Sequence, residues 1–239
     1  CWLIALYIMD ELSFDRFNRK ADRIVRVVQE ANWDGGRMHI ALTSAPFAPA
    51  LKESFPEIEE AVRIDPEGGG MIQHGSSNLK VDDMIVADKS LFQIFTYEFL
   101  EGNAATALDD PQSIVITESL AKTLFGSAAL AMGQLVVFPG NPPVHVTAVI
   151  RDIPQNSHLR FRGVRPIPAG YTSGWQNANL YTYLLLKNPS GIGSLRAGLP
   201  AFATRTIGKE MQTTEYHIEL QSLLSIHLHS NLDYEISAN

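Results

Sequence analysis

Two strand–helix–strand patterns, one toward each end of the chain, constrain the fold more than any other feature. The first runs from a β-branched segment at residues 24–31, through a helical apolar stripe at 47–55, to an apolar segment at 61–64. The same order of strand, helix and strand recurs over residues 181–220. Two such units can share one sheet in a split β-α-β arrangement. We therefore predict an α+β fold whose main sheet is built from both ends of the chain.

The middle of the chain carries strand and helix signals of its own. Ser113–Ile116 is a short apolar strand, and Thr117 is placed to cap a helix over residues 118–125 that Gly126 closes. Upstream, Leu79–Ala87 is interpreted as one strand after a flexible Gly68–Gly70 loop, and Ser44 as the N-cap of the first apolar helix.

Composition changes near residues 101–111 and again over 163–178, where Gly, Pro and Ser are frequent. Such changes are typical of domain boundaries. We therefore predict two lobes, a main lobe of residues 21–102 plus 163–239 and an inserted small α/β lobe of residues 103–162.

The first nine residues, Cys1–Met9, are all apolar, and the chain does not begin with Met. Nine residues cannot span a bilayer, which needs about 20. They fit the end of a membrane-spanning helix, or the buried first helix of a soluble protein, and the residues alone leave both open. In the first case the apolar spacing predicts one helix that leaves the membrane and continues as an amphipathic stalk from Ile8 to Asn18, so that residues 1–20 form an anchor and stalk.

Charge argues against two classes of partner. The chain holds 19 basic and 26 acidic residues, with a net charge of −7. Nucleic acids and anionic lipid headgroups are bound largely through excess Lys and Arg, so both are disfavoured. The single cysteine, Cys1, excludes an internal disulfide and a CxxC metal site.

Motifs for nucleotide or acyl chemistry are absent from the sequence. No P-loop string occurs, because Gly208-Lys209 is followed by Glu210 and lacks the upstream glycine. No nucleophile elbow occurs either. We therefore expect no enzyme activity and no cofactor, and any ATP hydrolysis must come from a partner chain.

His227 and His229 are the one metal-like pair. In an extended segment, residues i and i+2 face the same way, so both imidazoles could reach one ion, as in a metallohydrolase. His217 is on a nearby predicted strand, but no acidic ligand follows before Asp233. We favour hydrogen bonding by these side chains and predict no metal.

Three aromatic residues lie in Gly- and Pro-rich loops: Trp33, Tyr171 and Trp175. Exposed loop aromatics can anchor a binding partner. Aromatic side chains more often bury their area in the core, so packing is the favoured interpretation and partner binding the alternative.

Five stretches of the sequence match those of a known family, namely Tyr7–Phe17, Ala21–Val27, Ser113–Gly126, Asp152–Leu159 and Ile226–Ser230. On these stretches the sequence resembles the periplasmic core domain of MacB-type and FtsX-like ABC transporter permeases. The stretches follow the family's order from end to end, and the His227–His229 pair belongs to the family string without implying a metal. The sequence departs from the family after Gly126, where Ala131–Gln134 replaces the usual turn, which leaves the path of the inserted lobe open.

The resemblance implies a two-lobed fold, with lobes called Porter and Sabre, in the periplasm between the first and second of four inner-membrane helices. It implies a cytoplasmic ABC ATPase as partner and a permease homodimer or heterodimer. It further implies a periplasmic adaptor, or a lipoprotein or peptide cargo, as a possible partner.

Our leading hypothesis is that the stalk couples ATP hydrolysis in the cytoplasm to movement of the periplasmic lobes, for export or extraction of a substrate. The stalk residues expected to carry it are Asp10, Glu11, Leu12, Phe14, Asp15, Arg16 and Phe17. The alternative is a binding or sensing module that regulates a partner such as a cell-wall enzyme.

Overall fold

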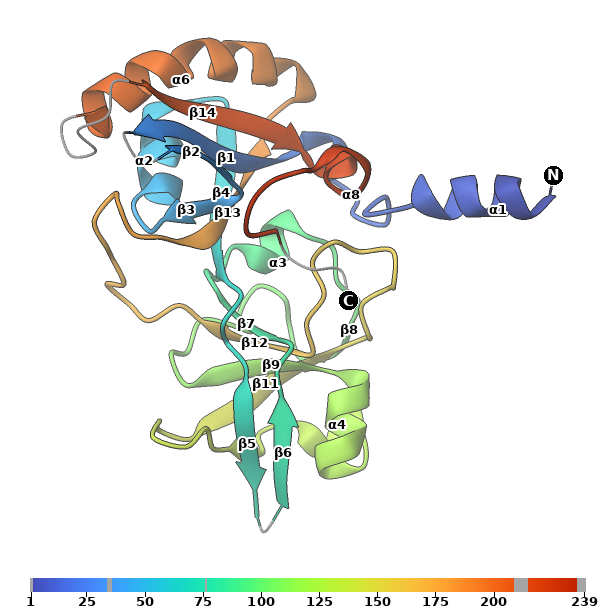
Figure 1. The fold of residues 1–239 in the computed structure, drawn as a ribbon. Coiled ribbons are helices and arrows are strands. Elements are labelled where there is room, and N and C mark those ends of the chain that lie inside the picture. The colour runs from blue at the N-terminus through green and yellow to red at the C-terminus, as the bar shows by residue number, and fades with distance from the viewer. Residues whose placement is uncertain (1, 34–35, 76, 209–214, 236–239) are drawn as a thin grey trace. The chain divides into compact units, whose positions relative to one another are not determined.

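The computed structural model describes residues 2–33, 36–75, 77–208 and 215–235 (Figure 1). The chain forms two compact units. Unit 1 comprises Cys1–Arg63 and Tyr171–Asn239, and unit 2 comprises Ile64–Gly170. The predicted lobes divide elsewhere, at 102/103 and 162/163, and that division stays a prediction.

Unit 1 is built on the two strand–helix–strand patterns. The first comprises β1 (Ile24–Trp33), α2 (Phe47–Ser54) and β4 (Ile58–Asp65), and the second comprises β13 (Ala178–Leu186), α6 (Ile192–Thr206) and β14 (Glu215–Ser222). The strands lie in the order β14-β1-β13-β4, and β1 is antiparallel to both of its neighbours. This is the split β-α-β order that the sequence predicts, and the α+β fold class is confirmed.

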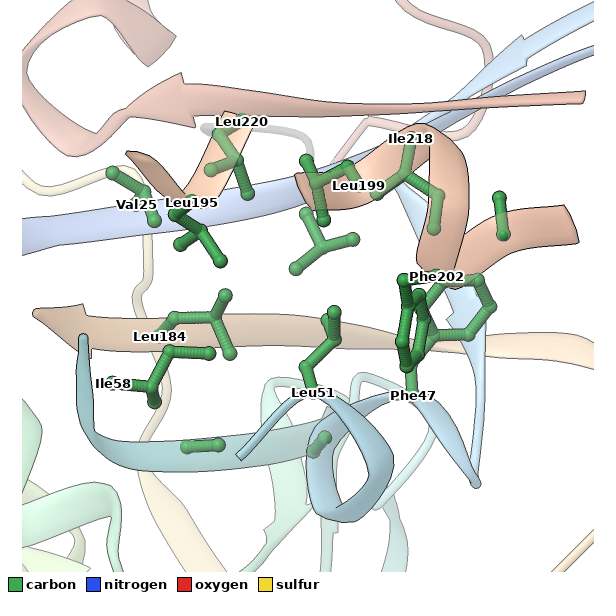
Figure 2. Packing of buried hydrophobic residues seen from close by; sticks show 14 of the residues in the cluster. Val25, Phe47, Leu51, Ile58, Leu184, Leu195, Leu199, Phe202, Ile218 and Leu220 are labelled. Carbon is green, nitrogen blue, oxygen red and sulfur yellow. The ribbon is translucent and has the colours of Figure 1, made fainter. Parts of the chain in front are cut away.

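Helices α2 and α6 pack on the same face of this sheet (Figure 2). Side chains from α2, such as Phe47 and Leu51, meet side chains from α6, such as Leu199 and Phe202, above Leu184 of β13. Because successive strand residues point to opposite faces, Val25 and Val27 of β1 face this core, while Arg26 faces the other side of the sheet. That other side carries the candidate site.

Short elements complete unit 1. β2 (Gly36–Ile40) pairs with β1, β3 (Leu42–Ser44) pairs with β13, and single turns form η1 (Ala21–Arg23) and η2 (Pro189–Gly191). The predicted N-cap role of Ser44 is wrong, because Ser44 pairs with Ala178 in the sheet and α2 begins after Pro46.

Within unit 2 the strands lie in the order β10-β11-β9-β12-β7, and β8 pairs with β11. The bounds are β7 (Met84–Ala87), β8 (Phe99–Glu101), β9 (Ser113–Thr117), β10 (Leu135–Val136), β11 (Val144–Ile150) and β12 (Gly163–Pro166). The helices are α3 (Leu91–Ile94), α4 (Glu118–Phe125) and α5 (Ala128–Ala131). A separate hairpin joins β5 (Gly70–His74) and β6 (Ser77–Val81). A second apolar core, which includes Ile72, Leu120 and Val146, lies within this unit.

The local sequence signals in unit 2 predicted some of its helix and strand bounds correctly and others not. Helix α4 has the predicted bounds, and Gly126 after it takes a left-handed φ of 88°, as a C′ glycine does. Thr117 stands at the N-cap, but its side chain makes no cap hydrogen bond. The predicted strand Leu79–Ala87 is two strands, because β6 belongs to the hairpin and β7 pairs with β12.

The Gly68–Gly70 segment also differs from the flexible loop expected there. A Cβ atom on Gly68 would lie 2.6 Å from the Ile85 carbonyl carbon, so the backbone passes close against β7. Glycine is required here by close packing.

Candidate functional site

The N-terminal helix α1 (Trp2–Glu11) presents large apolar side chains to solvent. Trp2 is 84% exposed, Tyr7 65% and Met9 68%. Soluble domains rarely leave such a run uncovered. Among the helices that the structure describes, none is both long and apolar enough to cross a membrane.

The chain turns sharply after α1. Leu12–Asn18 forms successive turns, in which the Ser13 amide donates to the Asp10 carbonyl and the Arg16 amide to the Ser13 carbonyl. Asp15 has a φ of 60°, in the left-handed region that a helix cannot include. The prediction of one helix through Asn18 is therefore wrong, because a left-handed residue interrupts it.

The predicted stalk residues divide into two groups. Asp10, Leu12 and Arg16 are exposed, whereas Glu11, Phe14 and Phe17 are half-buried and Asp15 is buried. Two of the half-buried residues, Glu11 and Phe14, contact the C-terminal part of unit 1.

Glu11 and Phe14 both contact His227. His227 Nε2 lies 2.9 Å from Glu11 Oε2. The Phe14 ring stacks on the imidazole, with centroids 3.3 Å apart and an angle of 3° between the planes. The His227 side chain thus joins the end of α1 and the turns after it to the C-terminal segment of unit 1.

The two histidines do not form the extended pair that the sequence predicts. Residues 223–229 form η3 (Leu223–Ser225) and α8 (Ile226–His229), so His227 and His229 are two positions apart on a helical turn and point in different directions. Over the residues that the structure describes, no group of three His, Cys, Asp or Glu side chains could hold a metal ion. Hydrogen bonding of His227 to Glu11 is the interaction that the structure shows.

A second link holds the C-terminal segment to the sheet. Arg26, whose side chain is 0% exposed, bonds to both oxygens of Glu235 at 2.7 and 2.8 Å. Its Nη2 also donates to Gln221 Oε1 at 2.6 Å and to Ser230 Oγ at 2.9 Å. The guanidinium therefore ties β1 to β14 and to residues 230–235.

Two tyrosines of β13 border this arginine. Tyr183 is opposite Arg26 in the β1–β13 register, and Tyr181 donates its hydroxyl to the Tyr234 carbonyl at 2.8 Å. Burial raises the pKa of Tyr181 to about 12 and also raises the pKa of Tyr183, to which the nearby Asp15 carboxylate contributes. Asp15 from the N-terminal segment and Glu235 from the C-terminal segment thus approach one cluster. We call Glu11, Phe14, Asp15, Arg26, Tyr183, His227 and Glu235 the terminal clamp.

The loop aromatics occupy different surroundings. Trp175 packs against the unit 1 core, with its ring centroid 5.1 Å from that of Phe47. The Tyr171 hydroxyl accepts a hydrogen bond from Asn179 Nδ2 at 3.0 Å. Trp33 ends β1, and its side chain lies outside the described residues. The packing interpretation fits Trp175, and partner binding by these loops stays a prediction.

Sequence reasoning missed Arg26, Tyr183 and Glu235. One signal could have found the first of them, since Arg26 interrupts the β-branched run Ile24–Val28 at a position that must face a covered side of the sheet. No comparable local pattern in the sequence marks Tyr183 or Glu235 as a partner of Arg26.

Known proteins resemble the chain in both sequence and fold. The family profile described as "MacB-like periplasmic core domain" matches residues 3–201. A domain of a protein described as a permease, from Porphyromonas gingivalis, has a TM-score of 0.75 at 22% identity, over 86% of this chain and 91% of that one. The periplasmic region of MacB from Actinobacillus actinomycetemcomitans has a TM-score of 0.54 at 16% identity, over 84% of this chain and 89% of that one. No curated protein matches the chain.

Proposed function

This chain belongs to the family of MacB-like periplasmic core domains, and we propose that its terminal clamp transmits movement between the membrane part of an ABC transporter permease and the periplasmic units. The family is a component of inner-membrane permeases that work with an ABC ATPase and dimerise, and it is not a classical enzyme. The clamp gives force at α1 a route to the sheet in addition to the chain that runs from Glu11 into β1.

The contact between Glu11 and His227 carries this proposal. Glu11 is the last residue of α1, and His227 is in α8, which is 216 residues away in sequence. A displacement of α1 therefore pulls on α8 directly, through the Glu11–His227 hydrogen bond and the Phe14–His227 stack. From α8 the short segment to Glu235 leads to Arg26 in the middle of the sheet.

This mechanism differs from coupling through a rigid stalk. The turns after Glu11 would absorb a tilt of α1 if nothing else held them, because a chain of turns is less stiff than a helix. The Glu11–His227 contact lies ahead of the turns, and Phe14 adds a second contact with His227 from within them. We propose that Glu11 and Phe14 act at the contact, Asp15 shapes the turn, and the exposed Asp10, Leu12 and Arg16 contribute less.

The proposal is tested in the full-length permease with its ATPase. Glu11→Gln and His227→Gln keep the approximate size of each side chain and remove the histidine–carboxylate pair. We expect each variant to lower transport while ATP hydrolysis continues, and the double variant to be no worse than the stronger single one, because both remove the same contact.

A second histidine–carboxylate pair supplies the control. His145 Nε2 lies 3.8 Å from Asp110 Oδ2 on the surface of unit 2, and His145→Gln should leave transport unchanged. Normal transport in both clamp variants, with normal folding, would contradict the proposal. Equal loss in the His145 variant would show a general defect instead of uncoupling.

We propose that the permease acts as a homodimer or heterodimer and that a periplasmic adaptor, or a lipoprotein or peptide cargo, contacts the domain. We also propose, from the family resemblance, a Porter-like lobe of residues 21–102 plus 163–239 and a Sabre-like lobe of residues 103–162.

A further inference from the structure

A groove lies along one side of unit 1, between β14, the start of α6 and the segment after α8. Its volume is about 530 Å³. Polar side chains dominate its lining, among them His39, Arg196, Glu219, Ser222, His229 and Asn231. A polar groove of this size is suited to a hydrogen-bonding ligand.

Strand β14 forms one wall of the groove and is an edge strand. It pairs with β1 along Glu215–Ser222, and it ends the strand order of the sheet. In the part of the chain that the structure describes, no strand pairs with its second edge. An edge strand offers backbone N–H and C=O groups to an added strand. Arg196 Nη2, which donates to the Leu220 carbonyl at 2.9 Å, marks the point where a side chain of α6 reaches this strand.

The charge of the groove differs from that of the whole chain. Arg196 is a permanent cation, and His39 and His229 are basic groups, whereas Glu219 is the one acidic residue in the lining. Glu219 Oε2 lies 3.4 Å from His39 Nε2. That ring nitrogen is buried beside Glu219 and makes no hydrogen bond to any described residue. In a chain of net charge −7, this local excess of basic groups favours an acidic ligand.

We propose that this groove binds an extended acidic segment of another polypeptide, which adds to β14 as a further strand. Backbone hydrogen bonds to the β14 edge supply affinity, and carboxylates of the segment face Arg196, His39 and His229. A free anion would use the basic groups but not the strand edge. The inference does not depend on coupling through the terminal clamp.

The test uses the 239-residue chain and a defined probe. The probe is a fluorescent, end-capped octapeptide of alternating Glu and Thr, compared with a Lys–Thr octapeptide and with a Glu–Thr octapeptide N-methylated at alternate residues. We expect anisotropy to show binding of the first peptide alone, and hydrogen exchange at β14 amides to slow when it binds.

Variants locate the binding to the groove. Arg196→Glu should weaken binding by about tenfold. Arg205→Glu makes the same charge change at an exposed position of the same helix outside the lining and should have little effect. Glu219→Gln should strengthen binding, because it removes the one carboxylate that repels the probe.

Several outcomes would overturn the proposal. Absence of binding by the Glu–Thr peptide, or equal binding by the Lys–Thr peptide, would remove the acidic-segment assignment. Equal binding by the N-methylated peptide, or full competition by citrate at the same carboxylate concentration, would show a simple anion site. Concentration-dependent dimerisation that Arg196→Glu abolishes would assign the groove to a second copy of the chain.

Discussion

Arg26 is fully buried and charged, and its partners come from separate segments of the chain. Burying a guanidinium costs several kcal/mol unless a counterion and hydrogen-bond acceptors compensate. Glu235, Gln221 and Ser230 provide them, so the C-terminal segment is held in place by the need to neutralise one residue of β1. The cost of separating Arg26 from Glu235 makes this the strongest single contact of the terminal clamp.

Replacement of Glu235 by Gln should therefore destabilise the chain. The amide keeps an acceptor oxygen but leaves the buried cation without a counterion, and we expect a loss of about 1–3 kcal/mol in the free energy of unfolding. Urea denaturation measures it. Glu98→Gln is the matched control, since the Arg151–Glu98 pair is exposed and worth about 0–1 kcal/mol. Equal losses in the two variants would contradict the role given to Arg26.

Alkaline pH should destabilise unit 1. The pKa of Tyr181 is about 12 in the folded chain, because of burial, against 10.0 for the ordinary side chain. The unfolded chain therefore loses this proton first, so stability is full below pH 10 and falls as pH rises toward 12. Urea midpoints at pH 8, 10 and 11 should fall less in Tyr181→Phe. Part of the fall should persist, because burial also raises the pKa of Tyr183 and Tyr216. An identical fall in variant and parent would refute this explanation.

Helix α6 forms although its local sequence has weak helix propensity. It carries glycines at 193 and 198, and Pro200 in its interior, none of which favours a helix. Leu195, Leu199 and Phe202 are nevertheless buried against α2 and the sheet (Figure 2). Tertiary burial of this apolar stripe outweighs the weak local propensity.

The two glycines of α6 should respond oppositely to alanine. A Cβ atom on Gly193 meets nothing within 4 Å, so Gly193→Ala should stabilise the chain by about 0.5–1 kcal/mol through helix propensity. A Cβ atom on Gly198 would lie 2.5 Å from Phe55 Cε1, so Gly198→Ala should displace that ring and cost about 1–3 kcal/mol. Thermal unfolding of both variants checks the opposite signs. A shift in the same direction would show that the Phe55 contact does not matter.

At the scale of the whole molecule, each unit has a hydrophobic core of its own. The unit 1 core uses residues from both ends of the chain, between Val25 and Leu220. The unit 2 core lies within residues 72–149. Unit 2 is continuous in sequence, whereas unit 1 needs both of its segments. A continuous segment that contains its whole core is able to fold alone.

A fragment of residues 64–170 should therefore unfold cooperatively by circular dichroism. A fragment of residues 103–162, the predicted inserted lobe, lacks Ile72, Val81 and Met84 of this core and should not. Cooperative unfolding of the shorter fragment would instead support the lobe boundaries at 102/103 and 162/163.

Local patterns determined much of this fold from the sequence alone. The β-branched run of β1, the apolar stripe of α2 and the bounds of α4 with Gly126 are visible in short windows, because strand and helix periodicity and capping are local properties. The order of these elements also indicates the split sheet, and the resemblance of short stretches to permease domains identifies the family.

Only the tertiary structure decided the rest. Glu11 meets His227 across 216 residues, and Arg26 meets Glu235 across 209, distances at which no local pattern specifies a partner. The left-handed Asp15 ends a helix that apolar spacing alone would extend. The split of residues 79–87 into β6 and β7 depends on which strands they pair with. Periodicity specifies which face of a helix or strand is buried. Which residues pack against that face depends on tertiary contacts, and these form only when the whole chain has folded.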